Sequence, residues 1–332
     1  MHLRKLHQRP LEWDNLIKAY SSKNLFHESA WLDFLGDAFP FVSIDYLEII
    51  NNKNVVGYFP AVRMTKFLIS MYSSPHYFGY MSPLFDRDVD QAKLLGAVLK
   101  YGRDKGISRI DLCNDAFDPA VVMAAGFTQH SNVTHVCPLD GGEKSVWDNM
   151  IGTCRTRIRK AEKSGLVVRV AHDPGFIDDF YPLFAKMLVG KGLKPGYNIG
   201  QAKALFHRLH AADRLFALRV EYQGKLIGTA FYPHDDRAMY YGDSAYEPDS
   251  LQYCPNNLLH WTAIRMAIER KIPEFNMGGG PVPSLFTTKF GGGLRPLLTY
   301  QKNLIPLFHQ TYTAYSFFKQ NGYKLLEKFT NP

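Results

Sequence analysis

The sequence predicts an α+β (mixed α/β) protein made of two domains, each a mixed sheet flanked by helices. Its 332 residues exceed the roughly 100–200 residues of a typical single domain. In both halves, segments with the period of a strand alternate with segments with the period of a helix, in a similar order. We place the boundary near residues 140–142, which gives domains at residues 1–140 and 141–305.

In the first domain, apolar residues recur at helical spacing over residues 25–39 and 90–105, and Gly106 is expected to end the second helix. The expected strands cover residues 43–50, 54–64 and 109–113. Residues 68–85 are aromatic and interrupted by proline and glycine. This pattern is typical of a strand followed by a loop that lines a site.

The second domain is expected to begin with a helix and to end in a glycine-rich loop. The expected helices cover residues 146–163, 176–188, 199–211 and 257–270. The expected strands are 166–171, a hairpin over 214–233 that turns at residues 222–225, 238–246 and 274–279. A last helix, within about residues 306–332, is expected to pack back on the first domain. Its aromatic residues and its lysines leave a second interpretation open, which is peripheral contact with a membrane surface.

Composition limits the classes of function. The formal net charge of +8, from 39 Lys and Arg against 31 Asp and Glu, favours an anionic partner such as nucleic acid or a phosphorylated substrate. A hydrophobic content of 46% excludes intrinsic disorder. The four cysteines lack the spacing of zinc or redox motifs, and we expect no metal. No segment has the apolar length of a signal peptide or a membrane span, so we expect a cytoplasmic protein.

Several motifs in a fixed order carry a family resemblance. They are WDNMIGTCRTRIRKAEKSGLVV at residues 147–168, the strands KLIGTAFYP and MYYGDSA, the segment PNNLLHWTAIRMAIERKIPEFNMGGG, the loop LFTTKFGGG, and SSPHYFGYMSPLF in the first half. With these motifs the chain resembles the Fem family of peptidoglycan-bridge aminoacyltransferases, which are built on the acyl-CoA N-acetyltransferase (GNAT) fold. The resemblance implies two tandem GNAT-like domains with an interdomain cleft. It also implies transfer of an acyl or aminoacyl group to an amine.

Cations gather on the predicted helix 146–163, at Arg155, Arg157, Arg159, Lys160 and Lys163. At 3.6 residues per turn, the first, third and fifth of these form one stripe. An anion would relieve their mutual repulsion, and the arginine fork fits phosphate oxygens. We expect contact with an anionic substrate, either the acceptor end of a tRNA or a nucleotide- or lipid-linked precursor. A solvated basic face is the alternative.

The GNAT resemblance implies a glycine-rich loop for the pyrophosphate of acetyl-CoA, between residues 238–246 and the helix near residue 258. The chain has EPDSLQYCPNNLL at that place. A loop without glycine cannot bring its backbone so close to a diphosphate. We therefore expect no tightly bound cofactor, and a co-substrate that is aminoacyl-tRNA in preference to acyl-CoA.

Two glycine triplets follow the last predicted strand, and the first is Gly278, Gly279 and Gly280. Successive backbone amides can stabilise an oxyanion, although turns at a strand end also use glycine. In the Fem family a lysine follows an aromatic residue here and steadies charge at the transferred carbonyl. The resemblance places that slot at Thr287, with Lys289 two positions later. Either Lys289 takes over this catalytic role, or the charge is lost.

Other candidate residues lie on strands and loops. Asp243, beside Tyr241, could accept the proton of an attacking amine, and a solvated strand-end carboxylate is the alternative. Lys194 lies in a glycine-rich loop of the kind that closes over anionic substrates, or that is merely solvated. His76 and Tyr80 are candidates for binding the acceptor, because their loop is similar to the substrate loop of the Fem family.

Together these features predict an amide-forming acyltransferase or aminoacyltransferase that acts on an amine of a cell-envelope precursor or small molecule. Two alternatives stay open. One is an acyl-CoA-dependent N-acyltransferase of polysaccharide or lipid biosynthesis. The other is a catalytically silent protein that binds nucleic acid or an envelope precursor, because Thr287 stands in the lysine slot.

Overall fold

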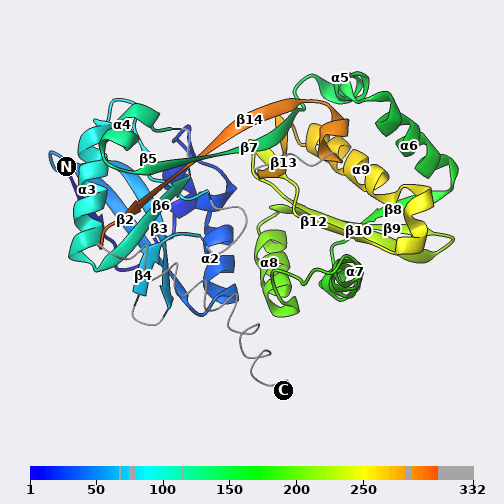
Figure 1. The fold of residues 1–332 in the computed structure, drawn as a ribbon, viewed down its shortest axis with the longest axis horizontal. Helices are drawn as coiled ribbons and strands as arrows, with labels where there is room; N and C mark the ends of the chain where they lie inside the picture. The colour runs from blue at the N-terminus through cyan, green and yellow to red at the C-terminus, as the bar shows by residue number, and fades with distance from the viewer. Residues whose placement is uncertain (67–68, 75–79, 114–115, 281–285, 306–332) are drawn as a thin grey trace, which may run out of the picture. The chain divides into compact units, whose positions relative to one another are not determined.

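The computed structural model describes residues 1–66, 69–74, 80–113, 116–280 and 286–305. The chain divides into two compact units (Figure 1). Of the described residues, unit 1 holds those within Met1–Pro10, Phe41–His130 and 299–305, whereas unit 2 holds those within Leu11–Pro40 and Ser131–Leu298. The strands β7 (Thr128–Pro138) and β14 (Gly293–Asn303) each have residues in both units.

Unit 1 is a mixed sheet with strand order β1-β2-β3-β4-β6-β14, and β5 pairs with β3. Adjacent strands are antiparallel except β4 and β6, which are parallel. The strand bounds are β1 His2–Lys5, β2 Val42–Asn51, β3 Asn54–Lys66, β4 Ile69–Tyr72, β5 Leu84–Phe85 and β6 Ile107–Cys113. Its helices are α3 (Gln91–Asp104) and α4 (Pro119–Ala124).

Helix α3 forms where the apolar spacing predicts it. The Asp90 side chain accepts a hydrogen bond from the amide of Lys93 at 3.0 Å and so caps the first turn. Its apolar face, with Leu94, Leu95, Val98 and Leu99, is buried. Gly106, with a φ of 67°, ends the helix as expected.

Unit 2 contains most of the helices described. The helices are α1 Trp13–Ile17, α2 Ser29–Ala38, α5 Gly142–Asn149, α6 Gly152–Lys163, α7 Phe176–Gly190, α8 Ile199–Ala211 and α9 Pro255–Glu269. The strands are β8 Leu166–Val170, β9 Leu215–Tyr222, β10 Lys225–Pro233, β11 Ala238–Tyr240, β12 Asp243–Tyr246 and β13 Glu274–Gly280. Short 3₁₀ helices are η1 Leu25–His27, η2 Pro248–Tyr253 and η3 Thr287–Phe290.

The strands of unit 2 form two sets. One is an antiparallel sheet with the order β12-β10-β9-β8. In the other, β13 lies between β7, which is antiparallel to it, and β11, which is parallel. Helix α9 packs on β8, β9 and β10, while α7 packs on β12 and β10 and α8 packs on β9. The core cluster of unit 2 lies between α6, α9 and these strands.

Several sequence-based predictions differ from the structure. The predicted helix 146–163 is two helices, because Met150 and Ile151 are extended between α5 and α6. The predicted strand 238–246 is broken at Tyr241 and Gly242 into β11 and β12. The strands β7 and β14 were not expected at all. The last predicted helix lies outside the described residues.

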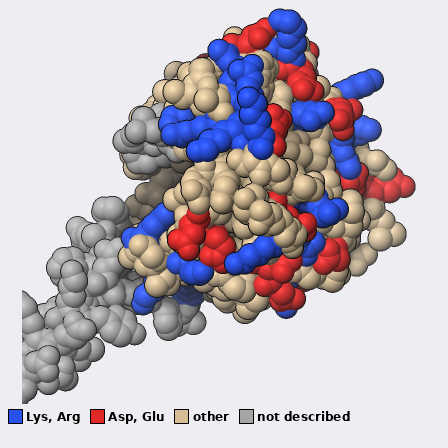
Figure 2. Space-filling model, turned by 90° about the vertical axis from the view of Figure 1, so that its right-hand side faces the viewer, with Lys and Arg blue, Asp and Glu red and all other residues tan. Residues whose placement is uncertain are grey.

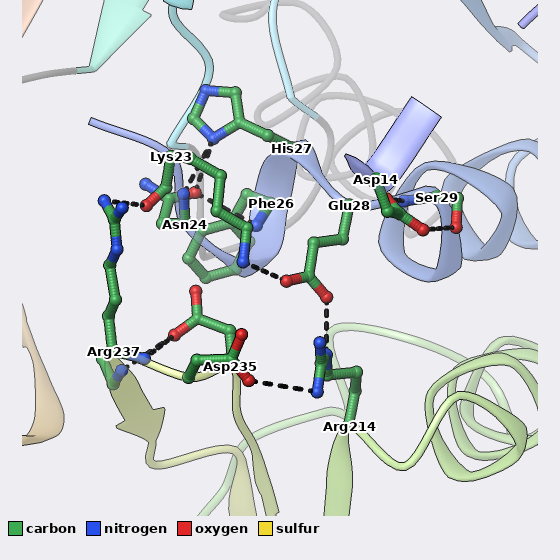
Figure 3. A network of polar contacts seen from close by, with 12 residues as sticks. Asp14, Lys23, Asn24, Phe26, His27, Glu28, Ser29, Arg214, Asp235 and Arg237 are labelled. Atoms are coloured by element: carbon green, nitrogen blue, oxygen red, sulfur yellow. Dashed lines mark hydrogen bonds and ion pairs between the residues drawn. The ribbon is translucent and has the colours of Figure 1, made fainter. Parts of the chain in front are cut away.

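Residues 11–40 belong to unit 2, although the sequence placed them in the first domain. Figure 3 shows the polar network that holds them there. Glu28 is paired with Lys23 and also accepts a hydrogen bond from Arg214 at 2.6 Å. Arg237 donates to the backbone carbonyls of Tyr20, Ser21 and Lys23. Arg214 and Arg237 lie about 190–220 residues from these partners in the chain, so no local pattern could have revealed their contacts.

Candidate active site

The strands β11 and β13 run side by side and then part. Ala238–Tyr240 pairs with Glu274–Asn276, and the amide of Tyr241 still donates to the Asn276 carbonyl at 2.8 Å. From Asp243 on, the chain pairs with β10 instead. Gly242 allows this change, because a Cβ there would come within 2.3 Å of the Phe231 ring. Asp243 is therefore the first residue of β12 after the strands part.

Asp243 is a candidate proton acceptor. Its Oδ2 accepts a hydrogen bond from the Tyr197 hydroxyl at 2.7 Å. Burial raises the pKa of the Asp243 carboxyl to about 6, although the bond from Tyr197 lowers it. The Tyr197 ring stacks on Phe184 with centroids 5.4 Å apart, and its carbonyl accepts from the Tyr181 hydroxyl at 2.8 Å. A carboxyl held in this way can take up a proton close to neutral pH.

Tyr241 and His260 connect this strand to α9. The Tyr241 hydroxyl bonds to the Ser244 hydroxyl at 2.8 Å, and burial raises the pKa of Tyr241. The centroids of the Tyr241 and His260 rings are 4.8 Å apart. His260 is fully buried, and burial lowers its pKa to about 3, so the ring is neutral. Its Nδ1 lies 2.9 Å from the Asn256 carbonyl, an acceptor, so Nδ1 carries the proton.

On its other side, His260 contacts η3, which holds the predicted catalytic residues. The Phe286 and Phe290 rings lie 5.2 and 5.3 Å from the imidazole, measured between centroids. Thr287 is buried, whereas Lys289 is half-buried. The carbonyl of Lys289 accepts a hydrogen bond from the amide of Ile151 at 3.2 Å, at the start of α6.

Cys154 is a residue of α6, the helix that contacts both η3 and α9. Its Sγ lies 3.7 Å from the Asn257 amide nitrogen in the first turn of α9. Burial raises the pKa of the Cys154 thiol, while Asn257, Arg157, Lys289 and Arg155 each lower it. The positive charges of the predicted catalytic Lys289 and of the predicted phosphate contact Arg157 thus both act on the Cys154 thiol.

The five cations of α6 do not act as one stripe. The Arg155 guanidinium donates to the carbonyls of Met150, Asp148 and Trp147 at 2.6, 3.0 and 3.1 Å, so it caps α5. The Arg159 guanidinium lies 5.2 Å from the centroid of the Trp147 ring. Arg157, Lys160 and Lys163 are exposed. Figure 2 looks onto the side of the molecule where α6 lies, and Lys and Arg side chains gather in its upper part.

The glycine-free segment before α9 forms η2, and three of its backbone amides donate hydrogen bonds to carbonyls of the protein. The amide of Glu247 donates to Ile227, that of Ser250 to Glu247, and that of Cys254 to Leu251. The Glu247 carboxylate is paired with Lys186 at 2.6 Å. These three amides therefore have partners within the protein, at the place where the resemblance implies a pyrophosphate loop.

The glycine triplet of β13 has packing reasons of its own. The amide of Gly278 donates to Asn276 Oδ1 at 3.0 Å, which also accepts from the Thr134 hydroxyl at 2.5 Å. A Cβ at Gly279 would lie 1.8 Å from the carbonyl oxygen of Val133 in β7. Gly280 pairs with Val133. The oxyanion role of these amides stays a prediction.

Of the remaining candidate residues, those that the structure describes lie outside the helices and strands. Lys194 is exposed in the loop between α7 and α8. Tyr80 is half-buried in unit 1, and His76 lies outside the described residues. Within the described ranges, no group of three or more His, Cys, Asp or Glu side chains could hold a metal ion. No helix in these ranges is both long and apolar enough to cross a membrane.

Sequence reasoning missed Tyr197, His260 and Asn257. Tyr197 reaches Asp243 from the loop between α7 and α8, 46 residues away in the chain. For His260 a signal was present, since an imidazole lay in the otherwise apolar segment LLHWTAI. Only the packing of η3 on α9 shows what it contacts.

A comparison with protein-family models finds one match within unit 2. Residues 149–283 match the family model described as an acetyltransferase (GNAT) domain. The fold of these residues is therefore that of a GNAT domain. The matched GNAT domain begins at the end of α5 and ends just after β13. It therefore contains Asp243, His260 and the cations of α6, while Thr287 and Lys289 follow it.

Solved structures share the fold of the GNAT domain and of the chain around it. A structure described as FemX has a TM-score of 0.71 and 13% identity, over 90% of this chain and 96% of that one. A tandem GNAT protein from the clavulanic acid biosynthesis pathway gives 0.57 and 10%, over 92% and 99%. The structure described as L-PGS from Bacillus licheniformis gives 0.54 and 12%, over 88% and 91%. No curated protein matches the sequence.

Proposed function

We propose that the protein forms amide bonds by moving an aminoacyl group from aminoacyl-tRNA to an amine of a cell-envelope precursor. The observation that carries the choice of donor is the segment 247–254, in which the amides of Glu247, Ser250 and Cys254 are engaged within the protein. An acyl-CoA diphosphate would need such amides free. The exposed cations Arg157, Lys160 and Lys163 suit the phosphates of an RNA strand instead.

Asp243 acts as the general base in this proposal. The acceptor amine loses a proton to the Asp243 carboxylate and attacks the ester carbonyl of the donor. A new C–N bond forms, the ester C–O bond breaks, and the released ribose hydroxyl takes up a proton. Tyr197 keeps Asp243 in position through its 2.7 Å hydrogen bond. Because the raised pKa lies near neutrality, the carboxylate can accept this proton and return it to solvent.

Lys289 supplies positive charge near the transferred carbonyl. It follows the buried Thr287 by two positions and lies close enough to Cys154 to lower the pKa of that thiol. A cation there stabilises a developing oxyanion. Lys289 in this way compensates for Thr287 in the slot where the resemblance implies lysine.

The test offers two donors in parallel, an aminoacyl-tRNA pool and acetyl-CoA, with an amine acceptor. Amide products are detected by mass spectrometry. We expect product from the tRNA donor alone, and loss of at least about 100-fold in rate for Asp243→Asn. Lys289→Met should lower kcat, while the exposed Asp249→Asn is the matched control that keeps it.

The outcome separates the proposal from its alternatives. Product from acetyl-CoA, with a ligand-induced rise in Tm, would establish the acyl-CoA-dependent N-acyltransferase instead. Binding of RNA without any product from either donor would establish a catalytically silent protein.

A further inference from the structure

A surface hollow lies near the cations of α6. Neither Asp243 nor any residue of η3 is among its lining residues. It has a volume of about 480 Å³ and is lined by Glu143, Lys144, Trp147, Glu162 and Trp261, from α5, α6 and α9. We call it the tryptophan hollow. The catalytic steps above make no use of it.

Trp147 gives the tryptophan hollow an accessible aromatic face. Of the four tryptophans in the chain, Trp13, Trp31 and Trp261 are 1–4% exposed, whereas Trp147 is half-buried. Its ring centroid lies 5.1 Å from that of Trp261, at an interplanar angle of 51°. Trp261 therefore braces the Trp147 ring, which stays partly exposed.

Arg159 adds a planar cation to this aromatic face. Its guanidinium carbon lies 5.2 Å from the centroid of the Trp147 ring. Guanidinium groups and aromatic rings both stack on nucleobases. A base that enters the tryptophan hollow can thus stack on the Arg159 guanidinium, which lies over the Trp147 ring.

The polar rim offers groups for the edge of a base. Glu143 is engaged by Arg265 at 3.2 Å, and Lys144 by Asp148 at 2.5 Å. Glu162 lines the hollow from α6 and is exposed. A carboxylate accepts hydrogen bonds from an exocyclic amino group, which cytosine, adenine and guanine carry and uracil lacks.

The outward face of α6 supplies the phosphate contacts that such a strand needs. Lys160 and Lys163 are exposed on the same helix as Arg159 and Glu162. We propose that the tryptophan hollow binds one amino-bearing nucleobase of a single-stranded RNA segment whose phosphates contact α6. This deepens the proposed function, on which it rests, because it names where the RNA part of the donor is bound.

The test measures RNA binding without any transfer reaction. Three fluorescein-labelled hexamers of equal charge are titrated at two salt concentrations: oligo(C), oligo(U) and an abasic ribose-phosphate chain. We expect oligo(C) to bind at least about fivefold more tightly than the abasic chain. Oligo(C) should also quench the tryptophan fluorescence of the protein, and the abasic chain should leave it unchanged.

Variants assign each part of this preference. Trp147→Leu should bring oligo(C) down to the affinity of the abasic chain, and Trp147→Phe should keep most of the difference. Glu162→Gln should reduce the preference for oligo(C) over oligo(U). Lys160→Glu with Lys163→Glu should weaken all three hexamers alike and lower the salt dependence, whereas the exposed Lys225→Glu is the matched control.

The proposal would be overturned by equal binding of oligo(C) and the abasic chain to the unaltered protein, and likewise by equal weakening of all hexamers by Trp147→Leu. If Trp147→Leu unfolds, Arg159→Gln takes its place, since it removes the stacked guanidinium from an exposed position. Base-selective binding without aminoacyl transfer would support the tryptophan hollow and refute the proposed function alone. Absence of binding to any hexamer would refute the tryptophan hollow and remove one support of an RNA donor.

Discussion

Tyr197 donates a hydrogen bond of 2.7 Å to Asp243 across two segments that the sequence keeps 46 residues apart. The tyrosine comes from the loop between α7 and α8, and the carboxylate from the first residue of β12. This loop therefore fixes the orientation of the candidate base. It also keeps the pKa of Asp243 lower than burial alone would leave it.

The pH dependence of transfer should report Asp243. Because burial raises its pKa to about 6, kcat/KM should rise with pH through about 6 and then level as the carboxylate forms. Tyr197→Phe removes a hydrogen bond that lowers this pKa, so the profile should move to higher pH. A profile that is flat between pH 5 and 8 would contradict the assignment of Asp243 as the base.

Asp243→Asn should stabilise the fold at neutral pH while it abolishes transfer. The native pKa of about 6 exceeds the ordinary value of 3.8, so the folded protein binds this proton more tightly than the unfolded chain. Stability is therefore lost as pH rises from about 4 to about 6. At pH 7.5 the variant should gain up to about 3 kcal/mol in the free energy of unfolding. Urea titrations at pH 7.5 and 4 should show the gain at the higher pH only.

Glu28→Gln should weaken the attachment of residues 11–40 within unit 2. Glu28 and Lys23 are both 6% exposed at their side chains, and Glu28 also neutralises Arg214. Loss of the carboxylate leaves the buried Lys23 without its counter-ion and leaves Arg214 with the exposed Asp236 at 3.5 Å, at a cost of about 3–5 kcal/mol. Asp37→Asn breaks an exposed pair with Arg208 and should cost less than about 1 kcal/mol. Denaturant unfolding compares the two, and equal effects would contradict a buried anchor.

Gly279→Ala should strain the pairing of β13 with β7. The new Cβ would lie 1.8 Å from the backbone carbonyl oxygen of Val133, so the strands would have to separate. We expect a loss of about 2–4 kcal/mol and a fall in Tm. Gly190→Ala is the matched control, because nothing lies within 4 Å of its Cβ at the end of α7. A neutral Gly279→Ala would show that β7 and β13 are further apart.

Local periodicity was enough to predict the elements that depend on neighbouring residues. The buried face of α3, the hairpin turn at Gln223 and Gly224 with φ of 51° and 75°, and the strand β13 are where the sequence placed them. Asp243 was also a candidate from its position in YYGDSA alone. Its raised pKa could not be predicted from the sequence, since the burial that causes it comes from segments far away in the chain.

Other features were beyond such patterns. The break between α5 and α6 is invisible to helical periodicity, because apolar spacing continues across Met150 and only the Arg155 contacts reveal a helix end. Likewise, the five cations share one sequence run, yet Arg155 caps α5 and Arg159 covers Trp147. Cations of one sequence run therefore make different contacts once a neighbouring helix packs against them.

By itself, the sequence determined the mixed α/β class, the glycine-free segment before α9 and the presence of a carboxylate in β12. Each of these depends only on residue type and on the spacing of residues that are close together in the sequence. Only the tertiary structure decided that Tyr197 orients Asp243, that the charges of Lys289 and Arg157 both lower the pKa of the Cys154 thiol, and that residues 11–40 belong to unit 2. Those pairings join residues tens to hundreds of positions apart, and hydrophobic burial and buried charge pairing select them only when the whole chain folds.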